Sequence, residues 1–149
     1  MYYCYGQVRS QKGGIPSGGS DNSKAWGVFT AGENPVEIIA GTYRSGDANE
    51  EYCLAIVPPS FPSLDGNTTI AGGIQGVIVL NGQLLGGLFT AAKPGNVYQD
   101  ITTKSQTGSR WIIPPYHHVV VFPTTATSSS DLPVYLLGMD LIEPGSKAY

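Results

Sequence analysis

The stretch Val77–Leu85, VIVLNGQLL, decides the fold class of this chain. Two apolar runs flank Asn81-Gly82, and Asn-Gly in that setting favours a type I′ turn, because both central residues of that turn need positive φ. The stretch therefore predicts a β-hairpin with one arm on each side of the turn. Gly86 and Gly87 interrupt the returning arm, which predicts a β-bulge at that point.

Short apolar segments of the same kind recur along the whole chain. They are rich in β-branched and aromatic residues and are separated by Gly, Pro, Asn and Asp, which is typical of strands. One window, Asp47–Ile56, also has helical spacing, and Asp47 and Glu50 are spaced as a capping box. A short helix there remains the alternative to a strand. The expected strands are Tyr2–Arg9, Lys24–Thr30, Val36–Arg44, Glu51–Val57, Ile74–Leu80, Gln83–Thr90, Arg110–Ile113, His118–Phe122 and Val134–Ile142.

This pattern predicts a single all-β domain over residues 1–149. We expect a β-sandwich of about eight or nine short antiparallel strands, jelly-roll-like because a jelly roll packs about eight strands into two sheets. A flexible Gly-rich loop is expected over Gly13–Ser20. A short C-terminal tail is expected over Pro144–Tyr149, because its proline cannot join a central strand.

The charge of the chain excludes several classes of partner. Charged residues make up only 13% of the sequence and the net charge is −3, whereas soluble domains typically carry about 25% charged residues. The basic residues are scattered, so we expect no nucleic-acid partner and no membrane surface. The apolar runs are too short to span a bilayer, and the first residues lack the pattern of a signal peptide. We therefore expect synthesis in the cytoplasm.

Two cysteines, Cys4 and Cys53, lie in apolar, strand-like surroundings. Free cysteine packs as a small apolar side chain, so two buried free thiols are the first expectation and a disulfide is the alternative. Neither cysteine has a cationic or histidine neighbour in sequence that would activate a thiolate.

Residues that could carry catalysis or hold a metal are few. His117 and His118 are adjacent, and neighbours on a strand point to opposite faces, so they do not form a zinc site together. Glu50 and Glu51 are best explained as solvated turn residues. The chain has no Gly-x-Ser-x-Gly elbow and no phosphate-binding loop. We expect no cofactor and no catalytic activity, and an enzyme built on distant carboxylates or His117 is the remote alternative.

Three aromatic residues, Trp26, Trp111 and Tyr116, are the weak candidates for ligand binding. Aromatic side chains can form a stacking platform for a sugar or a peptide, and they are enriched at protein interfaces. For the two tryptophans, a place in the core is the competing interpretation.

Several segments are apolar on consecutive residues, so that both faces of the expected strand are apolar. One face of a strand in a two-layer sandwich is normally polar. A second subunit or a long folded-over loop would have to cover the extra face, because large exposed apolar patches are unusual. The segments are Tyr2–Tyr5, Val77–Leu80, Val119–Phe122 and Val134–Leu137.

Low charge and these segments together favour a non-enzymatic structural subunit of a large assembly. We expect a phage or virus virion protein, such as a capsid decoration (cement) protein that stabilises the head. Its partners would be copies of itself, in a homo-oligomer such as a trimer, and a major capsid protein. The alternative is a carbohydrate- or receptor-binding β-sandwich module, lectin-like or associated with a tail.

Overall fold

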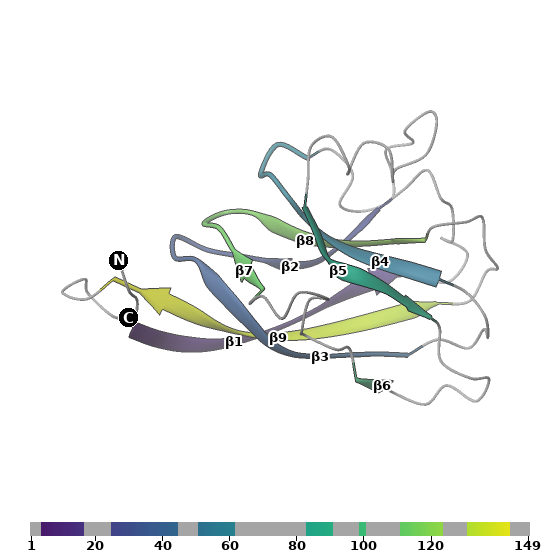
Figure 1. The fold of residues 1–149 in the computed structure, drawn as a ribbon, viewed down its shortest axis with the longest axis horizontal. Coiled ribbons are helices and arrows are strands. Elements are labelled where there is room, and N and C mark those ends of the chain that lie inside the picture. The colour runs from purple at the N-terminus through teal and green to yellow at the C-terminus, as the bar shows by residue number, and fades with distance from the viewer. Residues whose placement is uncertain are drawn as a thin grey trace.

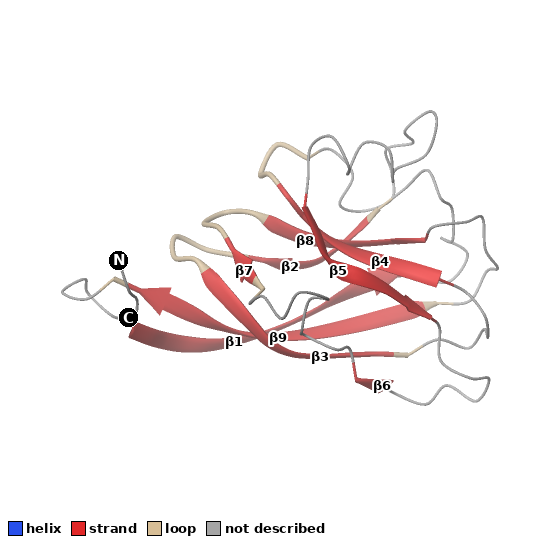
Figure 2. Ribbon diagram, in the orientation of Figure 1, coloured by secondary structure: helices blue, strands red, loops and turns tan. Residues whose placement is uncertain are grey.

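A computed structural model of the chain describes residues 4–16, 25–44, 51–61, 83–90, 99–100, 111–123 and 131–143. Every regular element in these ranges is a β-strand (Figure 2). The strands are β1 (Cys4–Ile15), β2 (Trp26–Thr30), β3 (Val36–Tyr43), β4 (Glu51–Val57), β5 (Gln83–Thr90), β6 (Gln99–Asp100), β7 (Ile112–Ile113), β8 (His118–Pro123) and β9 (Leu132–Ile142).

The strands form two antiparallel sheets that lie one above the other (Figure 1). Sheet A has the order β1-β9-β3-β6, with β7 also pairing with β3, and sheet B has the order β2-β8-β4-β5. Seven strands have five or more residues, three in sheet A and four in sheet B, while β6 and β7 have two residues each. The arrangement is that of an all-β sandwich, as the sequence predicted.

The strands pair in a nested order. The first strand pairs with the last (β1 with β9) and the second with the next to last (β2 with β8). Further inside, β3 pairs with β6 and β4 pairs with β5. Two further pairings, β3 with β9 and β4 with β8, join these four pairs into the two sheets.

The main core lies between the two sheets. Alternate residues of β9, such as Val134 and Leu136, face residues of sheet B such as Phe29, Leu54 and Val121, and all of them are almost completely buried. Because side chains alternate along a strand, the remaining residues of β9 point to the outer face of sheet A. The core therefore fixes which residues of sheet A can meet a partner.

The outer face of β4 and β8 in sheet B is covered within the chain. Ala55 and Val57 of β4 and Val120 and Phe122 of β8 form a second buried cluster together with Ala25 and Phe61. All four residues of Val119–Phe122 have no exposed surface. Of the two covers expected for this segment, another subunit or a folded-over loop, the chain itself provides the cover, and Ala25 and Phe61 outside the strands contribute to it.

Strand β1 continues through residues that the sequence assigned to a flexible loop. Gly13 pairs with Val134 and Gly14 with Pro133, so the expected Gly-rich loop cannot begin at Gly13. A Cβ at Gly13 would collide with the backbone of Gly27 and Val28, and Gly14 has a φ of 124°. Gly13 lets β1 pass close to β2, and Gly14 supplies the positive φ beside β9, so both glycines serve a strand, which composition does not reveal.

Two further predictions concern the glycine pair in β5 and the segment that forms β4. The interruption predicted at Gly86-Gly87 is confirmed as a shift of register, because Leu84 and Leu88 of β5 pair with Ala55 and Cys53 of β4. The segment Glu51–Val57 is a strand and not the end of a helix. The Asn81-Gly82 turn, the expected strand Ile74–Leu80 and the tail Pro144–Tyr149 lie outside the described residues.

Candidate functional site

The outer face of sheet A contains, on β1, β9 and β3, a three-by-three array of side chains, which we call the outer array. Its central row, on β9, is Tyr135, Leu137 and Met139. The registers on either side complete the array: each central residue pairs with one residue of β1 and one of β3. The three crosswise rows are Lys12–Tyr135–Thr42, Ser10–Leu137–Ala40 and Val8–Met139–Glu37.

The centre of the outer array is apolar and partly open to solvent. Tyr135, Leu137 and Met139 are half-buried, whereas Ala40 is exposed and Val8 is 51% exposed. A bulge between Ile38 and Ala40 also turns Ile39 outward, where it is 40% exposed. An open face of an antiparallel sheet is normally polar, so this face departs from the usual pattern.

The only charged residues in the outer array are Lys12 and Glu37, at opposite corners. The Lys12 ammonium lies 5.5 Å from the centre of the Tyr135 ring, which holds it over this face. The Tyr5 hydroxyl donates a hydrogen bond of 2.9 Å to Glu37 Oε2, which keeps the carboxylate on the same face. Both charges are therefore positioned by aromatic side chains.

A shallow hollow opens beside Leu137 in the outer array. It has a volume of about 110 Å³ and is bordered by small residues, Ser10, Ala40 and Gly41, and by Thr42 and Tyr135. Since about 10–15 Å³ of such volume holds one water molecule, the hollow has room for an aliphatic side chain. The face is thus shaped to accept a protruding apolar group.

Tyr116 is the second exposed candidate and lies at one end of the sandwich. It is 58% exposed and has a φ of 61°, a left-handed conformation that is uncommon for a residue with a side chain. Tyr116 N donates to Gly32 O at 3.0 Å, and His117 N donates to Pro114 O at 3.2 Å. These bonds hold the turn that presents the ring, which we call the Tyr116 turn (residues 114–117).

The structure separates the three aromatic residues proposed from sequence. Trp26 and Trp111 are each 5% exposed and belong to the core between the sheets, so neither can stack on a ligand at the surface. The backbone of Trp111 accepts a hydrogen bond from Ile38 N at 2.9 Å, which ties it to β3. Of the three, Tyr116 alone remains accessible.

The two adjacent histidines have different partners. His117 Nδ1 lies 2.8 Å from Pro115 O, and His118 Nδ1 lies 2.8 Å from Thr30 Oγ1. Burial lowers the pKa of His118, and the nearby His117 contributes in the same direction, while a hydrogen bond with the backbone of Pro59 opposes them. Among the described residues, no group of three potential metal ligands comes together.

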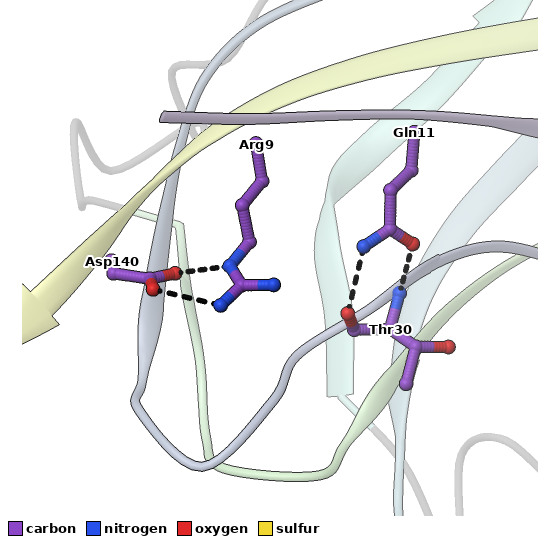
Figure 3. Close-up of polar contacts among 4 residues, drawn as sticks. All are labelled: Arg9, Gln11, Thr30 and Asp140. Carbon is purple, nitrogen blue, oxygen red and sulfur yellow. Dashed lines mark hydrogen bonds and ion pairs between the residues drawn. The ribbon is translucent and has the colours of Figure 1, made fainter. Parts of the chain in front are cut away.

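Buried charge is confined to one ion pair in the described part of the chain. The Asp140 side chain is 4% exposed, and Arg9 donates to it through Nε at 2.7 Å and Nη2 at 3.1 Å (Figure 3). The hydrogen bond with Asp140 raises the pKa of Arg9, so the guanidinium stays charged. This pair joins β1 to β9 and is best explained as structural.

Two other groups considered from sequence, the acidic pair and the two cysteines, are only partly described. Glu50 and the side chains of Glu51, Cys4 and Cys53 lie outside the described residues, so the acidic pair and the state of the thiols stay predictions.

No helix in the described ranges is long and apolar enough to cross a membrane.

Comparisons with known proteins do not point to a family or a function. No protein-family model matches the chain, and neither the curated proteins nor the solved structures contain a significant match.

Proposed function

We propose that this protein is a non-enzymatic structural subunit of a large assembly. The proposed assembly is a phage or virus particle, where the chain would act as a capsid decoration (cement) protein that stabilises the head. It would associate with copies of itself and with a major capsid protein. The observation that carries the proposal is the outer array, whose nine side chains have an apolar centre and carry charge only at two corners.

The strand order supports the same proposal through the fold. We infer that the two sheets form a jelly roll, because four nested antiparallel pairs are what results when one long hairpin curls into two layers. Jelly rolls of about eight strands occur in viral capsid proteins and also in lectins and cupins. The fold alone therefore fits a virion subunit but does not select it.

The support from apolar segments is narrower than the sequence suggested. Val119–Phe122 is covered within the chain, so it contributes nothing to the case for assembly. Of Val134–Leu137, Val134 and Leu136 are in the core while Tyr135 and Leu137 face outward. Val77–Leu80 and most of Tyr2–Tyr5 lie outside the described residues. Within the described part of the chain, the case for assembly therefore rests on the outer face of sheet A.

Incorporation into particles tests this function directly. Particles are purified on density gradients from the host that carries the gene, and the chain is quantified by mass spectrometry relative to the most abundant capsid protein. We expect a constant ratio across the particle peak, and we expect particles stripped of the chain to break at a lower temperature than particles to which it is added back. Absence from the particle peak would contradict the proposal.

The Tyr116 turn favours a second candidate function, a carbohydrate- or receptor-binding module. Strained backbone conformations cluster at ligand-binding sites, and loops at the ends of sandwiches often carry binding residues. If this candidate holds, a glycan array detects binding by the wild type and not by Tyr116→Ala. Ile112→Ala, which removes an exposed side chain from β7, is the matched control. An array with no hit for the wild type counts against this candidate.

A further inference from the structure

We propose that the outer array binds the outer array of a second copy of this chain, with Leu137 on the two-fold axis of the pair. The inference rests on the self-association in the proposed function, and it does not require that the assembly be a virion. It names the surface, the partner and the symmetry of the contact.

The positions of the two charges select a second copy as the occupant. Lys12 and Glu37 stand diagonally across Leu137 in the array. A two-fold interface is isologous, so each contact is made twice with the partners exchanged. The two-fold axis passes over Leu137, runs parallel to the face and is perpendicular to the line from Lys12 to Glu37. Rotation about this axis places Lys12 of each copy against Glu37 of the other. Two ion pairs form in the same operation, and no like charges of the array meet.

The centre of the array suits the same arrangement. Leu137 would meet the partner's Leu137, and the neighbouring Ser10 and Ala40 are small enough for the two sheets to approach closely. The hollow of about 110 Å³ beside Leu137 can receive an aliphatic side chain from the partner. Ile39 and Val8, which are 40% and 51% exposed, stand beside the centre as groups that such a contact would remove from water.

Other occupants fit the face less well. An anionic membrane or a nucleic acid would need a cluster of basic residues, and the array has one lysine and one glutamate. A strand added at an edge would pair with backbone groups and would leave the face itself open. A self-complementary face accounts for the apolar centre and for both corner charges.

Charge reversal tests the pairing of Lys12 with Glu37. The dissociation constant of the dimer is measured by sedimentation equilibrium for the full chain, the wild type, Lys12→Glu, Glu37→Lys and the double reversal. We expect the wild type to form a dimer of twice the 15.7 kDa chain mass. Each single reversal should raise the dissociation constant about tenfold or more, because two pairs of like charges then meet. The double reversal should restore it to within about threefold of the wild type.

Two further variants separate the interface from general effects of charge. Glu33→Lys makes the same acid-to-base change at an exposed position outside the array and should leave the dissociation constant unchanged. Leu137→Asp places a carboxylate on the axis, where it meets its own copy, and should give a monomer at every concentration tested. Urea unfolding of each variant confirms that the chain is still folded.

Several results would overturn the inference. These are a wild type that stays monomeric, a trimer, a dimer that neither single reversal weakens, and a double reversal that fails to restore binding. The particle experiment is independent of these results. A dimer with the expected reversal pattern and no incorporation into particles would refute the place of the chain in a particle and leave this inference standing. Incorporation of a monomeric chain would refute this inference and the self-association on which it rests, and would leave the place of the chain in a particle standing.

Discussion

The side-chain amide of Gln11 pairs with the backbone of Thr30 as if it were a neighbouring strand. Gln11 Nε2 donates to Thr30 O at 3.0 Å, and Gln11 Oε1 accepts from Thr30 N at 2.9 Å (Figure 3). Thr30 is the last residue of β2, and Gln11 lies on β1, so the two bonds join sheet B to sheet A at a corner of the sandwich. A side chain here satisfies backbone groups that no strand reaches.

Removing this link should weaken the fold slightly. Gln11→Ala leaves the Thr30 amide and carbonyl without their protein partner, and water can replace part of the interaction because the site is exposed. We expect a loss of about 1 kcal/mol in the free energy of unfolding, measured by urea denaturation. Gln7→Ala, at an exposed position of the same strand, should change it little. Equal losses in the two variants would show that the Gln11–Thr30 link contributes nothing.

The Arg9–Asp140 pair should respond unequally to loss of its two members. Arg9→Ala leaves a buried carboxylate without its cation, which should cost about 3 kcal/mol. Asp140→Asn leaves a guanidinium that is 35% exposed and can still be hydrated, so we expect about 1–2 kcal/mol. Replacing both residues with apolar ones, Arg9→Met with Asp140→Leu, should give stability closer to the wild type than Arg9→Ala. Urea unfolding measures all three, and a larger cost for Asp140→Asn than for Arg9→Ala contradicts this account.

His118 should make the fold less stable in mild acid. Its pKa in the folded chain lies below the ordinary value because burial disfavours the charged ring. The unfolded chain therefore binds the proton more readily, and the contribution of His118 to stability is complete above the unfolded pKa, at about 6.5. It is lost as the pH falls from about 6.5 through the lowered folded pKa.

Urea midpoints measured between about pH 7.5 and pH 5 check the His118 prediction. His118→Gln should reduce the fall in stability over this window, because the variant has no proton to gain there. His117→Gln is the matched control and should keep most of the fall, since burial is the larger cause of the His118 shift. If the stability of His118→Gln fell as much as that of the wild type over this pH range, other groups would be responsible for the pH dependence.

Gly13 should tolerate no side chain. A Cβ at this position meets the carbonyl oxygen of Gly27 and the Cα of Val28, so Gly13→Ala must push β1 away from β2. We expect a loss of about 3 kcal/mol or more by urea unfolding, the range of a substitution that overpacks or strains the interior. At Gly32, the nearest atom to an added Cβ is Arg9 Nη2 at 3.8 Å, so Gly32→Ala should be nearly neutral. Similar losses in both variants would contradict the close approach of β1 to β2.

The sequence was informative wherever local pattern alone sets the structure. Alternation and β-branched content located β2, β3, β4 and β8 to within two residues, and Gly86-Gly87 marked the irregular pairing with β4. The same signals failed at Gly13-Gly14, because glycine favours loops locally but is also required where two backbones cross closely. Burial of the tryptophans was an open alternative, since an aromatic residue on a strand can face either way.

What the sequence determined by itself is the fold class: a low-charge, all-β chain with short strands and frequent turns. Only the tertiary structure decided which strands are neighbours, because pairing depends on contacts between residues far apart in the chain. Pairing in turn decided that Val119–Phe122 is covered within the chain while Leu137 faces outward. It also brought Lys12 and Glu37 to opposite corners of one face, across β9. That relationship arises from the register of three strands, and the sequence of any one of them does not contain it.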